Sequence, residues 1–154
     1  MELLTNYANI LHPYNRRKAV SGIIILRSKN VLFPVATLQF LIGMLGVEDK
    51  ELRKTIYTFV LNDLQRINRH RRNNTINRQL QSWIHEYIKK NSDRVARKMV
   101  SLCISLYKKN IWGDAKVVNI IAAGCFSQSY KIRMIASHFL ISTTEPQEEE
   151  SSDE

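Results

Sequence analysis

Apolar residues recur at a three-four spacing in one segment of the chain after another. The clearest example covers residues 49–67, where one face carries Leu52, Ile56, Phe59, Val60, Leu64 and Ile67. Side chains three and four positions apart share one side of an α-helix, whereas a half-buried strand alternates apolar and polar residues. The 154 residues include only five glycines and three prolines, too few for the many tight turns of a sandwich or barrel. The chain is therefore predicted to be all-α.

Seven segments show this pattern, over about residues 16–27, 34–45, 49–67, 76–88, 93–109, 115–126 and 130–141. Asn15 is predicted to cap the first, which turns Val20, Ile23, Ile24 and Leu26 inward, and Ser92 is predicted to cap the fifth. The sixth has almost no polar face, so we expect it at the centre of the fold.

The third and fifth segments begin near Asp49 and Asp93, about forty residues apart, which is the period of HEAT and armadillo-like repeats. We therefore expect about seven helices in stacked antiparallel pairs, forming an α-solenoid over residues 1–143. Beyond Thr144 the composition changes, because residues 145–154 contain six acids and no apolar residue. Residues 144–154 are predicted to be a disordered acidic tail.

The segment from Asn30 to Val47 contains no charged residue. A membrane span needs about 20 predominantly apolar residues, and this run is shorter and contains Pro34, Gly43 and Gly46. We interpret it as a helix buried in the protein, and we expect no membrane association.

Chemistry-bearing residues are scattered. The two cysteines, Cys103 and Cys125, fall inside apolar helical patterns and are interpreted as buried thiols. The four histidines lack metal-ligand spacing, and His138 is predicted to lie in the core. The acids Glu48, Asp49 and Glu51 fit the capping of a helix start. We therefore expect no catalytic residue, metal, cofactor or small-molecule substrate.

Charge gives the strongest functional signal. The chain has 23 Lys and Arg against 14 Asp and Glu, and six of these acids are in the last ten residues, which leaves a body of net charge +15. Such a body favours a polyanionic partner, most often nucleic acid. Two sets of bases are the candidate nucleic-acid-binding residues: Arg66, Arg69, Arg71, Arg72 and Arg78; and Lys89, Lys90, Arg94, Arg97, Lys98, Lys108 and Lys109.

The first set forms a loop between helices. Arginine forks match phosphate oxygens, and the interleaved Asn68, Asn73, Asn74 and Asn77 can add contacts to sugars or base edges. In the second set, residues 89–98 span the end of one helix and the start of the next, so they are expected on one edge. For the first set the alternative is a solvated loop between helices, and for the second it is lysines that cap helix C-termini and keep the surface soluble.

Aromatic residues offer weaker signals. Trp83 and Tyr87 lie four residues apart on an apolar face and are predicted to pack in the core. For Tyr107 and Trp112 two interpretations remain, packing in the core and stacking on nucleic-acid bases.

Three strings, Leu52–Thr58, Tyr107–Asn119 and Gly124–Ser127, resemble the Sda-type family, named for severe depolymerisation of actin. The resemblance covers about residues 14–140. It implies a non-enzymatic helical-repeat scaffold of the nucleus and nucleolus that serves assembly and export of the large ribosomal subunit. The implied partners are rRNA and pre-ribosomal assembly factors. Family proteins run to several hundred residues, so the contacts of their other parts are outside this chain.

A second hypothesis uses the same charges differently. A helical-repeat adaptor or transport factor would use the basic residues to bind the carboxylates of acidic peptides, without RNA.

Overall fold

The structure is a computed structural model that describes Leu4, Tyr7 and residues 10–90 and 93–144. Between Pro13 and Thr144 it contains seven α-helices, two short 3-10 helices and, within the described ranges, no strand. The α-helices are α2 (Pro13–Ser28), α3 (Pro34–Gly43), α4 (Lys50–Asn68), α5 (Asn74–Lys90), α6 (Asp93–Lys108), α7 (Ala115–Ala123) and α8 (Tyr130–Thr144). The 3-10 helices are η1 (Met44–Gly46) and η2 (Gly124–Phe126). The all-α prediction with about seven helices is confirmed.

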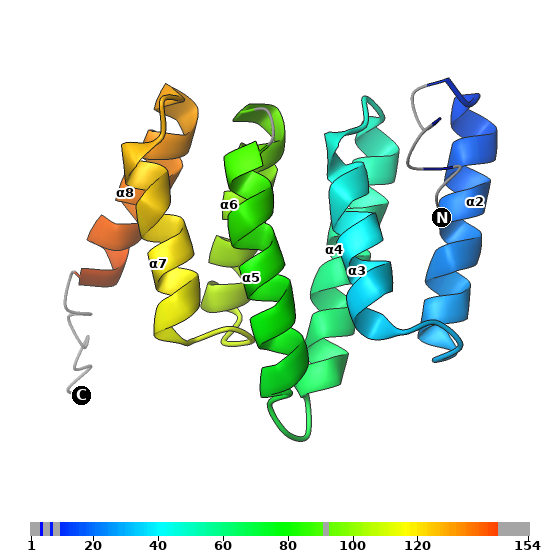
Figure 1. Cartoon of the computed structure of the whole chain (residues 1–154), viewed down its shortest axis with the longest axis horizontal. Coiled ribbons are helices and arrows are strands. Elements are labelled where there is room, and N and C mark those ends of the chain that lie inside the picture. The colour runs from blue at the N-terminus through cyan, green and yellow to red at the C-terminus, as the bar shows by residue number, and fades with distance from the viewer. Residues whose placement is uncertain (1–3, 5–6, 8–9, 91–92, 145–154) are drawn as a thin grey trace, which may run out of the picture.

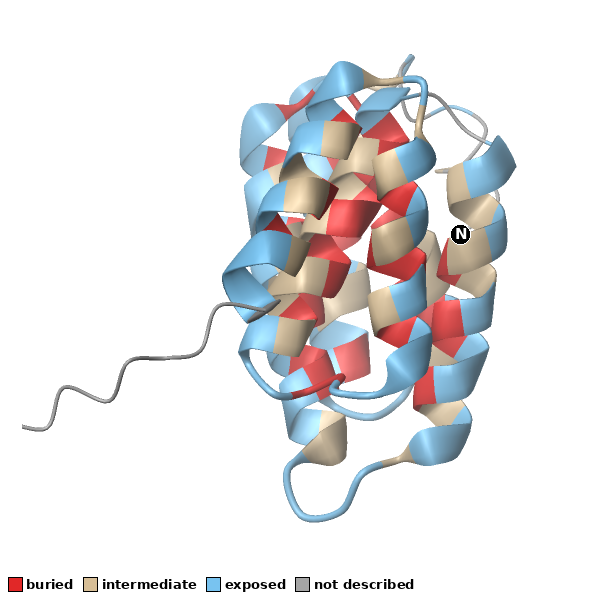
Figure 2. Cartoon of the chain, turned by 90° about the vertical axis from the view of Figure 1, so that its left-hand side faces the viewer, coloured by how far each residue is buried: buried red, intermediate tan, exposed pale blue. Residues whose placement is uncertain are grey.

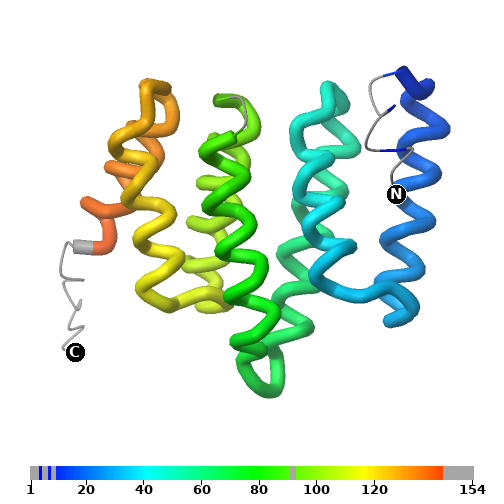
Figure 3. Tube along the Cα trace, in the orientation of Figure 1, coloured from blue at the N-terminus to red at the C-terminus, as the bar shows by residue number. Residues whose placement is uncertain are grey.

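The helices form two rows. Helices α3, α5 and α7 lie in front and α4, α6 and α8 lie behind them, while α2 closes the N-terminal end against α3 and α4 (Figure 1). The chain alternates between the rows as it moves along the stack (Figure 3). The front helices begin at Pro34, Asn74 and Ala115, about forty residues apart. This is the stacked-pair geometry of a helical-repeat solenoid.

The first and last helix pairs repeat one local device. Helices α3 and α7 each end in a 3-10 turn, and the next residue, Val47 or Ser127, is extended. A buttressing arginine follows in each rear helix: Arg53 donates to the Val47 carbonyl at 2.6 Å and Arg133 to the Ser127 carbonyl at 2.8 Å. The repeat is therefore visible in local geometry although the two sequences share few residues.

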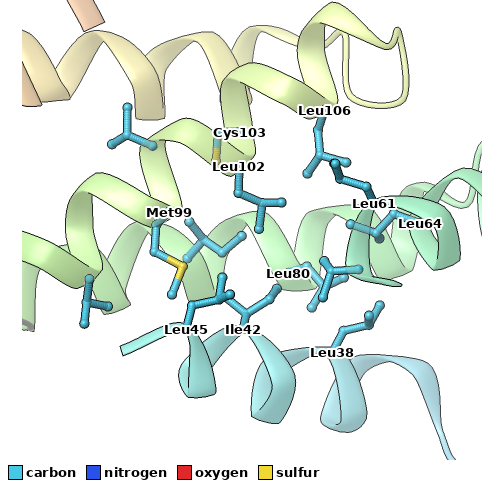
Figure 4. Packing of buried hydrophobic residues seen from close by; sticks show 14 of the residues in the cluster. Leu38, Ile42, Leu45, Leu61, Leu64, Leu80, Met99, Leu102, Cys103 and Leu106 are labelled. Carbon is cyan, nitrogen blue, oxygen red and sulfur yellow. The ribbon is translucent and has the colours of Figure 1, made fainter. Parts of the chain in front are cut away.

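The core lies between the two rows of helices (Figure 2). Residues of four helices interdigitate there, among them Leu38, Ile42, Leu80 and Met99 (Figure 4). The uncharged segment supplies several of its most buried side chains, including Leu41 and Leu45, which confirms that the helix at 34–45 is buried. No helix in the described part of the chain has both the length and the apolar character that a membrane crossing needs.

Several local expectations are corrected. Helix α2 begins at Pro13, not Arg16, and His12 rather than Asn15 caps it through Nδ1, which accepts from the Tyr14 amide. Proline suits the first turn because its missing N–H would have no intrahelical partner there. Leu26 is 43% exposed and so does not point inward.

The sixth helical segment is not central. It is α7, which belongs to the last pair, and the central position belongs to α6, which contacts α4, α5, α7 and α8. The apolar character of α7 serves its close packing against η2 and α8. Ser92 and the tail from Glu145 to Glu154 lie outside the described residues, so the domain boundary stays a prediction.

Helix α2 is held by two ion-pair networks that sequence analysis did not anticipate. Asp49, which caps α4, accepts from Arg16 at 3.2 Å and from Arg17 at 2.9 Å. Asp63 accepts from Arg27 at 2.9 Å and from Arg66 at 2.5 Å. Both carboxylates are at least 95% buried, and each joins α2 to α4.

Candidate nucleic-acid interface

The predicted bases divide between the two ends of α5. The loop group consists of Arg66, Arg69, Arg71, Arg72 and Arg78, at the end where the chain passes from α4 to α5. The turn group consists of Lys89, Lys90, Arg94, Arg97 and Lys98, where α5 passes to α6. A helix of 17 residues places these ends about 25 Å apart. One binding event at both groups therefore requires an extended partner.

Lys108 and Lys109 lie with the loop group. Lys108 is the last residue of α6 and Lys109 follows it, at the same edge of the stack, where Arg72 donates to the Asn110 side chain at 3.2 Å. The structure thus adds two lysines to the arginine loop that sequence order placed with the other set.

Most of the loop group is available to a ligand. Arg69, Arg71 and Arg78 are exposed, and none of them forms an ion pair with any residue that the structure describes. Their guanidinium groups can therefore bind phosphates without first breaking an internal contact.

Arg66 has a structural role as well. Besides Asp63 it donates to the Ser28 carbonyl at 2.9 Å, which fixes the end of α2. Its side chain is still 43% exposed. Removing it would disturb the joint between α2 and α4, so binding losses at Arg66 need a stability measurement beside them.

The asparagines of the loop hold it in place. Asn68 and Asn77 exchange side-chain hydrogen bonds at 2.8 and 3.1 Å, and Asn73 accepts from the Ile76 amide to cap α5. Asn77 is only 4% exposed and accepts from the Trp112 indole at 3.0 Å. These three amides are therefore internal contacts, and only Asn74 is exposed as a candidate for base or sugar contacts.

The same network explains the most specific of the three strings. Asn110 has a φ of 54°, which reverses the chain so that Ile111 and Trp112 both donate to the Leu106 carbonyl. Asp114 then caps α7 and accepts from the buried Gln81 amide. The string therefore fixes the turn from α6 to α7 against α5.

The aromatic side chains pack rather than project. Trp112 is 1% exposed, and Tyr107 is half-buried edge-on to Phe139, so both belong to the core. Trp83 and Tyr87 stack at 4.6 Å and pack against the core, which confirms the prediction for them.

The turn group is more constrained. Arg94 pairs with Glu48 at 2.9 Å, and Lys89 lies 3.7 Å from Glu86. Arg97 and Lys98 are half-buried, while Lys90 is exposed. Lys89 and Lys90 close α5 and Arg94 follows in the first turn of α6, as expected for one edge.

Sequence analysis missed the charge difference between the rows. Helices α4, α6 and α8 carry ten bases and three acids, for a net charge of +7. Helices α3, α5 and α7 carry four bases and one acid, for a net charge of +3. Five bases of the rear row are not among the predicted residues: Lys50, Arg53, Lys54, Lys131 and Arg133. Assigning the predicted helices alternately to two rows would have predicted that these bases lie in one row.

The described residues contain no group of three His, Cys, Asp or Glu able to hold a metal ion. Cys103 is fully buried, and burial raises its thiol pKa to about 12. Cys125 is half-buried, so its interpretation as a buried thiol holds only in part. His138 is exposed, which makes its placement in the core wrong.

Comparison with known proteins assigns the family. The family described as SDA1, HEAT repeat, matches residues 1–154. The chain belongs to the SDA1 family. The Protein SDA1 homolog of Drosophila melanogaster is 35% identical over 153 residues, which cover 99% of this chain and 22% of that protein. The homolog of Xenopus tropicalis is 34% identical over 96% of this chain and 22% of its own length. Protein SDA1 of Chaetomium thermophilum is 31% identical over 99% of this chain and 21% of its own.

The chain thus spans about a fifth of the length of these SDA1 relatives. The match falls on the HEAT-repeat region of the family, in agreement with the two rows of helices.

Proposed function

We propose that this SDA1-family chain is a non-enzymatic scaffold of large ribosomal subunit assembly and nuclear export of pre-ribosomes, acting in the nucleus and nucleolus. It docks on rRNA through its basic residues, and its helix faces contact other assembly factors. The resemblance at the strings around Trp112 supplies the biological setting, and the charge distribution supplies the mechanism.

One observation carries the RNA part of the proposal. The loop group and the neighbouring Lys108 and Lys109 place seven bases along one edge of the solenoid, where α4 passes to α5 and α6 passes to α7. Asp63, the nearest buried acid, is already neutralised by Arg27 and Arg66. The remaining positive charge attracts a phosphate backbone, and binding releases the counterions condensed on that RNA.

Salt-dependent binding of the full chain to fragments of large-subunit rRNA tests the proposal. In the variant Arg69→Gln/Arg71→Gln the affinity should fall, and the slope of log K against log salt should become shallower by about 1.5 to 2. A double variant with Lys18→Gln in α2 and Lys131→Gln in α8 removes the same charge away from the loop group and should change the slope less.

An equal loss of slope in the two double variants would mean that only net charge matters, and the loop assignment would fail. Partners captured by the full chain that all survive RNase treatment would favour the adaptor hypothesis instead.

A further inference from the structure

A basic groove lies between α4 and α6 in the rear row. It is a cavity of about 490 Å³ lined by Leu45, Lys50, Arg53, Lys54, Tyr57, Thr58, Lys98 and Ser101. Four of these lining residues are cationic and none is acidic. Sequence analysis had selected only Lys98, because the other three cations lie more than forty residues away along the chain.

None of the four cations forms an ion pair with a residue that the structure describes. Arg53 donates to the Val47 carbonyl, which orients its guanidinium at the groove but leaves its charge uncompensated. Like charges gathered in a partly enclosed space repel, so an anionic ligand gains both Coulomb attraction and relief of that repulsion.

The other residues that line the groove are uncharged. Leu45 is 1% exposed and forms part of the lining, and the Tyr57 hydroxyl lies 2.6 Å from the Ser105 hydroxyl and donates to the Ser101 carbonyl at 3.2 Å. A groove whose lining has four cations and no acid fits a peptide with carboxylate side chains.

This chain contains such a peptide. Residues 145–154 carry six carboxylates, three of them consecutive at Glu148, Glu149 and Glu150. We propose that the acidic segment Glu145–Glu154 docks in the groove between α4 and α6 of its own chain and competes there with RNA. The competition with RNA rests on the function proposed above, whereas the docking itself does not.

The geometry allows this contact. The segment follows Thr144 at the end of α8, in the same row as the groove. Lys98 lies in the second turn of α6. From Thr144, the segment has to run back beside α8 by about 14 Å to come level with Lys98. The groove is about one and a half helix spacings away, or about 15 Å. Ten extended residues span about 33 Å, which exceeds the resulting distance of about 20 Å.

Tethering strengthens a weak site. A short flexible connection gives a ligand an effective concentration in the millimolar range, so a site of only millimolar affinity is substantially occupied. Electrostatic docking of this kind is also salt-sensitive, because the Debye length falls to about 3 Å at 1 M ionic strength.

Carbodiimide crosslinking of the full chain without RNA tests the docking. This reagent joins a lysine amine to a carboxylate only when the two are in contact. We expect amide crosslinks from residues 148–154 to Lys50, Lys54 and Lys98, and their loss in 1 M salt. Lys18 and Lys29 on α2 should not react with the segment. Mixing isotope-labelled and unlabelled chains separates contacts within one chain from contacts between copies.

Crosslinks spread evenly over all lysines, or found only between differently labelled chains, would overturn the proposal. So would protection of Lys50, Lys54 and Lys98 by RNA without any crosslink to the segment, since RNA would then be the occupant of the groove.

RNA affinity gives the second readout. Replacing the six acids of the segment by their amides should tighten RNA binding by roughly fivefold at low salt. The same replacement in a Lys50→Gln/Lys54→Gln/Lys98→Gln chain should change affinity by less than twofold. Replacing the acids should keep its full effect in a Lys18→Gln/Lys29→Gln/Lys116→Gln control, whose lysines lie outside the groove.

An equal effect in both backgrounds would show general charge repulsion instead of docking, and would overturn the proposal. A chain that binds no RNA in any form would contradict the proposed function, while the crosslinks would still decide whether the segment docks.

Discussion

Some polar residues next to the basic loop are buried and hold the fold together through hydrogen bonds. Asn77 has the pattern of a surface loop residue, yet its amide joins α5 to the loop through Asn68 and to the turn before α7 through Trp112. A buried amide with three such bonds is costly to replace, because each partner left without a hydrogen bond loses its hydration as well.

Asn77→Ala should therefore lower the free energy of unfolding by about 2–3 kcal/mol. Asn74→Ala, three residues earlier and exposed, is the matched control and should change stability by less than about 0.5 kcal/mol. Urea denaturation followed by Trp fluorescence measures both. Similar stabilities of the two variants would mean that the Asn77 network contributes little.

At the scale of the helices, the close approach of neighbouring elements depends on where glycine lies. A Cβ at Gly124 would come within 3.1 Å of the Ala136 Cβ and 3.3 Å of Ile132, which is where η2 contacts α8. A Cβ added at Gly22, in the middle of α2, would have no such atom within 4 Å. The two glycines therefore have different roles although both lie in helical segments.

Gly22→Ala should stabilise the chain by about 0.5–1 kcal/mol, because alanine loses less backbone entropy on helix formation. Gly124→Ala should destabilise it by about 1 kcal/mol or more, since the added methyl meets a tightly packed partner. Thermal unfolding of the two variants gives the comparison. A shift of both melting temperatures in the same direction would contradict the packing assigned to Gly124.

For the whole molecule, a solenoid is stabilised mainly between neighbouring elements, so each helix depends on the contacts with its neighbours. Helix α2 packs against α3 and α4, and its contact with α4 depends on the buried carboxylates of Asp49 and Asp63. Hydrogen bonding from Arg17 is the main reason that the pKa of Asp49 lies well below its ordinary value.

This pKa shift gives a pH dependence with a definite sign. A lowered folded-state pKa stabilises the protein above the unfolded-state value of about 3.9, and the contribution is lost as the pH falls below it. Between pH 4 and pH 2, amide hydrogens of α2 should lose protection from exchange before those of α6. Asp49→Asn should weaken α2 already at pH 7, by about 3 kcal/mol, and flatten its pH dependence. Simultaneous loss of protection in α2 and α6 would show that the chain unfolds as one unit.

The helical periodicity, the low glycine and proline content and the forty-residue spacing were enough to predict an all-α stack of about seven helices. Local chemistry sets these properties, since the side chains of each segment decide which of its faces is apolar. Most helix ends were predicted within a few residues. The start of α2 was missed because the capping side chain of His12 was not considered.

What the tertiary structure alone decided is which distant residues meet. It placed Lys108 with the arginine loop, paired Arg16 and Arg27 with Asp49 and Asp63, and brought Lys50 and Lys54 to one groove with Lys98. The physical reason is that charges act through space. Sequence carries the net charge of +15 in the body, whereas the alternation of helices between two rows determines where that charge is concentrated.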